Sequence, residues 1–181
     1  MVFYMREESK PYIMSLDIEY EGQNIIQIGA IMLQWIGEHV YQICRSFNVY
    51  IKHDSPLSNF VQKYTNITNQ FINDYGVTLD EAIQQWDYFL EGIDHDDILI
   101  FSHGVFQDID LLDRSGFNIE DYELWDTLNM SKFILQREHH LTLQELAEEG
   151  GFPPVQQHNA YSDALTNLML YSYLLKLQGD D

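Results

Sequence analysis

The stretch 14-MSLDIEYEGQNIIQIGAI-31 decides the fold, because two apolar segments in it enclose a pair of acidic residues and a short turn. The segments before and after the turn at residues 21–24 predict two antiparallel strands. Successive side chains of a strand alternate between its faces, so Asp17 and Glu19 share one face. Carboxylates held so close repel each other unless a cation lies between them. An isolated Asp-x-Glu is more often the solvated end of a strand, so its assignment depends on the rest of the chain.

The composition indicates one domain with a sizeable apolar core and an acidic surface. The chain has 181 residues, of which 45% are hydrophobic, and a single domain over residues 1–181 is expected. Nine basic residues stand against 29 acidic ones, giving a formal net charge of -20. Such a charge repels polyanions at a distance. This excludes a protein that wraps or slides along duplex DNA, but it is compatible with an enzyme that holds a few nucleotides through metal ions.

Cysteine usage and hydropathy indicate a reducing, intracellular setting. Cys44 is the only cysteine, so neither an intrachain disulfide nor a cysteine-based metal cluster can form. It lies in an apolar segment and is expected to be an ordinary strand residue. No apolar run approaches the length that spans a membrane, so a cytoplasmic protein without a membrane partner is expected.

Hydrophobic periodicity predicts the remaining elements. Residues 39–52 alternate as a third antiparallel strand, and residues 98–101 and 123–126 predict two further strands. The expected architecture is α/β: a mixed central sheet of three antiparallel strands followed by two strands alternating with helices, flanked by helices. The expected helices begin at Ser55-Pro56 and cover residues 68–75, 78–92, 105–116, 127–135, 142–150 and 161–177.

Two of these helices have clear start signals. Thr78 and Thr142 each precede a glutamate by three residues, which is the spacing of a capping box. The first of the two helices has an apolar face that is expected to pack on the core, formed by Leu79, Ile83, Trp86, Leu90 and Ile93.

Among the aspartates of residues 105–116, Asp108 is the candidate for a functional site. Asp108 and Asp110 point roughly 200° apart on a helix, so at most one of them faces a given site. Asp108 lies near the helix start, beside the end of the preceding strand. Asp110 and Asp113 are expected to be solvated.

The sequence QHNAYSD contains a second candidate pair, His158 and Asp163. A histidine at the end of a loop and an aspartate in the first turns of the next helix can face one cleft. An imidazole has an ordinary pKa of about 6.5, so His158 suits general-base catalysis near neutral pH. His103 also precedes an aspartate by five residues, but it closes a buried strand and is expected to be a packed or hydrogen-bonded core histidine.

Four carboxylates from three separate segments are thus expected at the same end of one sheet: Asp17, Glu19, Asp108 and Asp163. Oxygen ligands without cysteine favour Mg²⁺ or Mn²⁺ over zinc. Two divalent ions offset four negative charges. Such a pair binds the attacking and leaving oxygens of a phosphoryl displacement, while His158 takes the proton of the attacking water.

The order of these motifs resembles the DEDDh family of 3'-5' exonucleases, which have an RNase H-like fold. DIE with GQNIIQIGAI, then HGVFQDIDLL, then HNAYSD correspond to its three exonuclease motifs. LWDTLNMSKF and HLTLQELAEEGGF resemble the family's stretch between the second and third motifs. The resemblance implies that Asp17, Glu19, Asp108 and Asp163 are metal ligands and that His158 is the general base.

Four positions depart from the family pattern. Tyr20 and Glu21 replace two threonines, Gly104 replaces an asparagine, and Gln107 replaces an aromatic residue. These departures concern contacts with substrate and remove no metal ligand. Tyr20 or Phe106 offers an aromatic surface on which a base can stack.

The expected function is that of a metal-dependent 3'-5' exonuclease that releases nucleoside monophosphates from single-stranded or short RNA or DNA. The alternative is a catalytically silent module of the same fold that binds nucleic acid or protein. An acidic mimic of nucleic acid is a third interpretation, which requires charges spread along a surface. The sequence does not distinguish RNA from DNA as substrate, and it leaves open the oligomeric state, a polymerase or other protein partner, and the roles of Tyr20 and Glu21.

Overall fold

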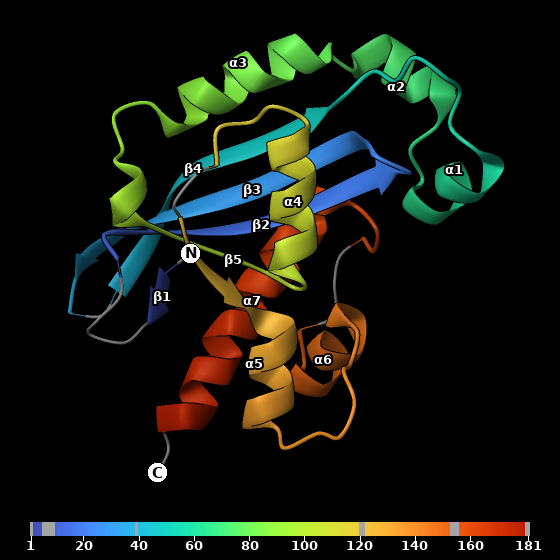
Figure 1. The fold of residues 1–181 in the computed structure, drawn as a ribbon. Helices are drawn as coiled ribbons and strands as arrows, with labels where there is room; N and C mark the ends of the chain where they lie inside the picture. Colours follow the sequence, from blue (N-terminus) through green and yellow to red (C-terminus); the bar gives the residue numbers. More distant parts are fainter. Residues whose placement is uncertain (1, 5–9, 39, 120–121, 153–155, 180–181) are drawn as a thin grey trace.

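The computed structural model describes residues 2–4, 10–38, 40–119, 122–152 and 156–179 (Figure 1). In this part of the chain, a six-stranded mixed sheet has the strand order β1-β4-β3-β2-β5-β6. The strands are β1 (Val2–Tyr4), β2 (Tyr12–Glu21), β3 (Asn24–Gly37), β4 (Val40–Tyr50), β5 (Ile98–Ser102) and β6 (Glu123–Asp126).

The strand directions confirm the expected mixed sheet. β2, β3 and β4 are antiparallel neighbours, β5 is parallel to β2, and β6 is parallel to β5. β1 is an addition that the sequence did not predict, and it pairs antiparallel with the far edge of β4. His39, which falls in the range expected for the third strand, lies outside the described residues.

Seven α-helices and one 3-10 turn are found in the described ranges. They are α1 (Asn59–Thr65), α2 (Asn69–Tyr75), α3 (Leu79–Leu90), η1 (His95–Asp97), α4 (Val105–Arg114), α5 (Thr127–Ile134), α6 (Leu143–Gly150) and α7 (Ala160–Gly179). None of the described helices combines the length and apolar composition needed to cross a membrane.

The predicted helix start at Ser55-Pro56 is wrong. α1 begins three residues later, because Ser58 is the residue whose side chain accepts the N–H of Val61 and so caps the helix. The backbone of Leu57 is held outside the helix, where its N–H donates to Asn69 Oδ1 at 2.7 Å.

The capping boxes at Thr78 and Thr142 are confirmed. The apolar face of α3 is turned slightly from the expected one: Trp86 is fully buried, but Leu79 is 38% exposed. Ala82 and Phe89 complete the buried face instead, because they lie four residues before and three residues after Trp86.

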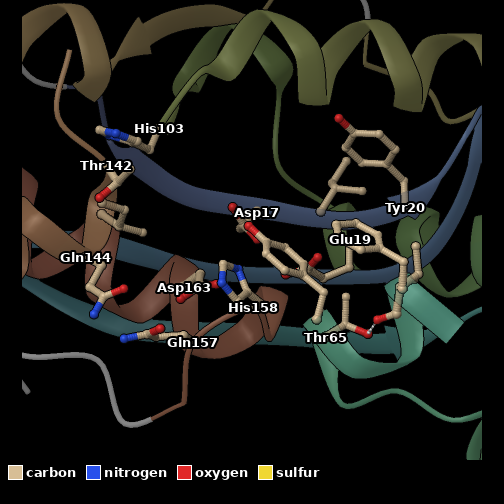
Figure 2. A pocket seen from close by; sticks show the side chains of 15 residues that line it. Asp17, Glu19, Tyr20, Thr65, His103, Thr142, Gln144, Gln157, His158 and Asp163 are labelled. Atoms are coloured by element: carbon tan, nitrogen blue, oxygen red, sulfur yellow. Dashed lines mark hydrogen bonds between the residues drawn. The ribbon is translucent and has the colours of Figure 1, made fainter. Parts of the chain in front are cut away.

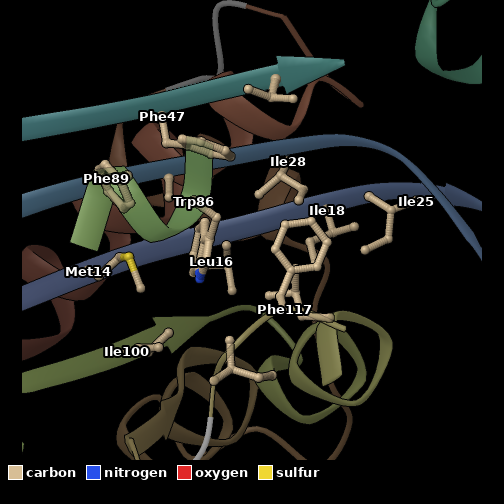
Figure 3. Packing of buried hydrophobic residues seen from close by; sticks show 14 of the residues in the cluster. Met14, Leu16, Ile18, Ile25, Ile28, Phe47, Trp86, Phe89, Ile100 and Phe117 are labelled. Carbon is tan, nitrogen blue, oxygen red and sulfur yellow. The ribbon is translucent and has the colours of Figure 1, made fainter. Parts of the chain in front are cut away.

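The two faces of the sheet are covered by different helices (Figure 1). On one face, Met14, Leu16 and Ile18 of β2 pack in a core cluster with residues of α3 and α4, among them Trp86 (Figure 3). On the other face, Ile13 packs with residues of α7. Strand alternation therefore places the odd-numbered residues of β2, including the predicted acidic pair, on the α7 face.

Helix α7 lies unusually close to β3. A Cβ atom on Gly29 would overlap the backbone of Ala160 and Tyr161, so the first turn of α7 is seated against a position without a side chain. Gly29 is the strand partner of Asp17. This contact brings the start of α7 to the acidic end of β2.

Candidate active site

A cavity of about 710 Å³ opens where β2 ends, between α1, the start of α6 and the start of α7 (Figure 2). Its walls come from segments far apart in the sequence. It is lined by Asp17, Ile18, Glu19, Tyr20, Phe60, Val61, Tyr64, Thr65, His103, Thr142, Leu143, Gln144, Gln157, His158 and Asp163.

The floor of the cavity carries the acidic pair of β2. Asp17 and Glu19 both line it, as the strand alternation predicted. The pairing of β2 with β3 shifts register between Glu19 and Tyr20. Such an irregularity bends the end of a strand and redirects its side chains.

The first turn of α7 brings Asp163 to the cavity, and the loop just before this helix brings His158 there. Asn159 caps the helix, since its Oδ1 accepts the N–H of Ser162 at 3.2 Å. His158 precedes the cap in the left-handed conformation, with φ 53°. Ligand atoms of Glu19, His158 and Asp163 all lie within 4.8 Å of one another.

Asp108 approaches from α4, which covers the opposite face of the sheet from α7. Its carboxylate accepts a hydrogen bond from Ser102 Oγ. It is not a lining residue of the cavity, but its charge raises the pKa of both Asp17 and Glu19, so it lies behind the same cluster. Asp110 is exposed and pairs with Arg114 at 2.9 Å, and Asp113 is also exposed, so both are solvated as predicted.

Without a cation, the ionised forms of the clustered carboxylates are destabilised by burial and by their mutual repulsion. Burial, followed by the charges of Asp108, Asp163 and Glu19, holds the pKa of Asp17 well above its ordinary value. Burial and neighbouring carboxylates raise the pKa of Glu19 to about 8.

The other two carboxylates show the same effect. Burial raises the pKa of Asp108 to about 7 although Ser102 opposes the shift. Burial raises the pKa of Asp163 to about 6, against hydrogen bonds from the backbone of His158 and Asn159. Among the described residues that line the cavity, none is Lys or Arg. Oxygens of Glu19 and Asp163 lie within 4.8 Å of each other, and Asp17 and Asp108 lie close enough for their charges to act on the same cluster. Carboxylates grouped in this way fit hard divalent cations, which would lower these raised pKa values.

The exonuclease model RNase_T matches residues 13–171, which include the acidic pair of β2, Asp108 of α4 and the start of α7. The chain belongs to the RNase_T exonuclease family. Its sequence is similar to part of two longer bacterial proteins. It is 29% identical over 164 residues to the 3'-5' exonuclease DinG of Bacillus subtilis (strain 168), covering 87% of this chain and 16% of DinG. It is 25% identical over 172 residues to a PolC-type DNA polymerase III of Caldanaerobacter subterraneus, covering 90% of this chain and 11% of that protein. The RNase_T chain thus spans only a small part of these relatives.

Solved structures share the fold of this RNase_T chain. The nuclease domain of 3'hExo, a DEDDh family member bound to rAMP, superposes with a TM-score of 0.73 at 15% identity, over 94% of both chains. E. coli exonuclease I in a complex with single-stranded DNA gives a TM-score of 0.73 at 15% identity, over 95% of this chain and 42% of that one. The predicted RNase H-like exonuclease fold is therefore confirmed.

In this RNase_T domain, His103 is hydrogen-bonded, as predicted, but it is only partly buried and also lines the cavity. Its Nε2 pairs with the Leu141 carbonyl at 2.9 Å and its Nδ1 lies 3.3 Å from Thr127 Oγ1. Burial lowers the pKa of His103. The imidazole thereby holds the segment before α6 against the cavity.

The aromatic wall of the cavity comes from α1, which sequence reasoning did not connect with the site. Phe60 and Tyr64 are one helical turn apart, and their rings stack with centroids 5.7 Å apart. The Tyr64 ring stacks in turn on His158, with centroids 3.6 Å apart and planes at 26°. Tyr20 lines the cavity, as expected for a stacking surface, whereas Phe106 is exposed and is not a lining residue. The spacing of Phe60 and Tyr64, four residues apart on one helix, is the sequence feature that could have predicted this aromatic wall.

The structure gives Glu21 a role that the sequence left open. Its two carboxylate oxygens accept the N–H of Ser58 at 3.0 and 3.1 Å, at the capped start of α1. Hydrogen bonding from the side chain of Ser58, followed by that from its backbone, lowers the pKa of Glu21. Glu21 therefore ties α1, with its aromatic residues, to the end of the strand that carries Asp17 and Glu19.

Buried polar contacts fix α7 against the sheet. Gln27 of β3 accepts the N–H of Ala160 at 3.1 Å. Further along the helix, Asn167 donates to Ser15 Oγ at 3.3 Å and accepts from Thr127 Oγ1 at 2.5 Å. These contacts hold the helix that carries Asp163 in register with β2.

Proposed function

We propose that residues 1–181 act as one exonuclease domain that hydrolyses single-stranded or short nucleic acid from the 3' end and releases nucleoside monophosphates. The observation that carries the proposal is the meeting of Asp17, Glu19, Asp163 and His158 in one cavity of an RNase_T family fold. The 3'-5' polarity is supported by the name of the DinG relative.

Asp17, Glu19, Asp108 and Asp163 are the residues that would hold two divalent metal ions, Mg²⁺ or Mn²⁺. When bound, such a pair supplies Lewis-acid stabilisation to the attacking and leaving oxygens of a phosphodiester. These carboxylates would supply the oxygen ligands of the ions, and the ions would in turn favour the ionised carboxylates, which the metal-free cluster disfavours. Ser102 and the backbone of His158 and Asn159 fix the two carboxylates that reach in from helices.

His158 would accept the proton of the attacking water. Burial lowers the pKa of His158, so its imidazole is neutral and able to accept a proton at neutral pH. Its nearness to Glu19 and Asp163 places it beside the carboxylates where the scissile phosphate would lie. The His158 ring and the carboxylates come from different elements, so base and ligands can act on one phosphate together.

The walls of the cavity suit a few nucleotides of single strand. Tyr20 offers an aromatic surface on one side of the cavity, and Gln144 and Gln157 offer amide groups across from it (Figure 2). Base stacking is tolerant of sequence and needs an unpaired strand. The structural neighbour exonuclease I was crystallised with single-stranded DNA, which supports the same class of substrate here.

The test is release of nucleotides from a 5'-labelled oligonucleotide in Mn²⁺. Wild-type protein should shorten the labelled strand progressively from its 3' end and give a ladder of labelled products. Asp163→Asn should abolish this ladder. Asp113→Asn is the matched control, because Asp113 is an exposed aspartate on α4 and should cut like wild type. Binding of the oligonucleotide without any cleavage would instead favour the catalytically silent module, and a wild-type rate in Asp163→Asn would refute the assignment of the site.

A further inference from the structure

In many hydrolases a hydrogen-bonded partner orients the general base, but the described part of this chain offers no such partner to the His158 imidazole. Within the described residues, neither ring nitrogen of His158 takes part in a hydrogen bond. Its backbone is in the left-handed region, outside the helix that follows. Some other contact must therefore fix the rotation of this ring.

Tyr64 provides that contact. Its ring covers one face of the imidazole, with centroids 3.6 Å apart and planes inclined by only 26°. Such face-to-face contact prevents the imidazole from turning about its Cβ–Cγ bond without displacing Tyr64. A ring nitrogen of His158 lies within 4.8 Å of carboxylate oxygens of Glu19 and Asp163, so the edge of the ring that Tyr64 leaves uncovered adjoins these two carboxylates.

Tyr64 is itself held in place. Phe60 stacks on it from the outer side, at an interplanar angle of 15°. The start of α1 is tied to β2 by the hydrogen bonds from Ser58 to Glu21. The end of α1 is tied down by Thr65, whose hydroxyl donates to Val61 and accepts from Ile67. Hydrogen bonds therefore hold both ends of α1, which keeps Tyr64 in place beside His158.

We propose that Tyr64 is a positioning residue, whose ring fixes the orientation of the His158 imidazole for proton transfer. The proposal rests on the proposed exonuclease function, in which His158 is the general base. General bases act only within hydrogen-bond reach and in the right direction, so a ring free to rotate transfers protons less often. The contrasting role for Tyr64 is direct stacking on a base of the substrate.

A double-mutant cycle separates these two roles. Tyr64→Leu should lower kcat about tenfold with KM nearly unchanged, because the ring loses its support. Tyr64→Phe keeps the ring and should restore kcat. In a His158→Ala background, Tyr64→Leu should have no further effect, because the group it positions is gone. Tyr88→Leu, an exposed tyrosine on α3, is the matched control and should behave like wild type.

An equal loss from Tyr64→Leu in both backgrounds, or a loss confined to KM, would overturn the proposal and assign Tyr64 to substrate stacking. Cleavage by the wild type that Asp163→Asn abolishes would support the exonuclease function independently of the role of Tyr64. If wild type does not cleave at all, the proposed function fails, and the stack is then judged by the following measurement alone.

Histidine NMR tests the contact without any turnover. In metal-free protein, the ring protons of His158, assigned from their absence in His158→Ala, should be shifted by the ring current of Tyr64. Tyr64→Leu should remove the shift and Tyr64→Phe should retain it, while Tyr88→Leu leaves it unchanged. A His158 signal that does not respond to Tyr64→Leu would overturn the inference.

Discussion

Gly29 of β3 lies against the backbone of Ala160, the first residue of α7, so closely that a side chain on Gly29 would overlap it. Gly29 is also the strand partner of Asp17. The close approach of helix and strand at this point explains how a carboxylate of β2 and a carboxylate of α7, 146 residues apart in numbering (17 and 163), come to share one cavity.

We therefore expect Gly29→Ala to displace the start of α7 and with it Asp163 and His158. The substitution should destabilise the fold by about 1–3 kcal/mol and lower nuclease activity far more than the loss of folded protein explains. Denaturant unfolding and the cleavage rate at a temperature where both proteins are folded measure the two effects. Gly37→Ala is the control: its φ of 112° makes alanine strained there, but it lies at the other end of β3. Comparable activity in the two variants at equal stability would contradict this account.

The raised carboxylate pKa values predict an unusual dependence of stability on pH in metal-free protein. The pKa of Glu19 rises from 4.5 to about 8 on folding, so the folded state binds more protons than the unfolded state in that interval. Its contribution to stability is fully present below pH 4.5 and is lost as the pH rises through about 8.

Thermal unfolding in EDTA should therefore show a lower Tm at pH 8 than at pH 5.5, and Mn²⁺ should raise Tm more at pH 8. Glu19→Gln removes this titrating group, so it should flatten the decline and reduce the gain from Mn²⁺. An unchanged Tm profile in Glu19→Gln would mean that the Glu19 carboxylate is not destabilising when metal-free.

The buried polar contacts of Asn167 predict a stability effect that apolar packing alone does not. Asn167→Leu leaves Thr127 Oγ1 and Ser15 Oγ without their amide partner and should cost about 1–3 kcal/mol. Urea unfolding measures the change. Thr166→Val is the control on the same helix, because Thr166 Oγ1 donates only to the carbonyl of Ser162 one turn back, and it should cost less. A smaller loss of unfolding free energy in Asn167→Leu than in Thr166→Val would show that the hydrogen bonds of Asn167 do not stabilise the fold as predicted.

The absence of Lys and Arg among the described lining residues predicts a weak response to salt. A protein with six to ten phosphate contacts loses about 10³–10⁵ in affinity between 50 and 200 mM salt. At constant Mn²⁺, KM for a short oligonucleotide should instead change less than about threefold over that interval, since few counterions are released. A small decrease in KM with added salt also agrees with this prediction, because salt screens the repulsion between the strand and the formal charge of -20. A steep rise in KM would show that basic residues outside the cavity hold the strand.

Most of the sheet and the acidic site followed from local patterns. Alternation around Asp17 and Glu19 predicted that they share a face, and the helix geometry separated Asp108 from Asp110, which the structure shows paired with Arg114 at the surface. The continuous apolar run of β5 predicted a strand buried on both sides, and all of its residues are buried. These features depend on a few neighbouring residues, so the sequence carries them directly.

The features that sequence reasoning missed depend on contacts over long distances. Ser55-Pro56 has the local pattern of a helix start, but the contact between Leu57 and Asn69, which only the tertiary structure reveals, keeps residues before Ser58 outside α1. The stack of Tyr64 on His158 joins residues of α1 and the loop before α7, and no local pattern relates them. The edge strand β1 is defined by its pairing with β4 rather than by its own sequence.

The central claim is that carboxylates from β2, α4 and α7 hold divalent metal together, and anomalous diffraction from crystals containing Mn²⁺ tests it most directly. We predict two manganese peaks in the space bounded by Asp17, Glu19, Asp108 and Asp163, with both peaks weakened or lost in Asp17→Asn. Absence of manganese from this space in wild-type crystals, or peaks that persist unchanged in Asp17→Asn, would contradict the claim.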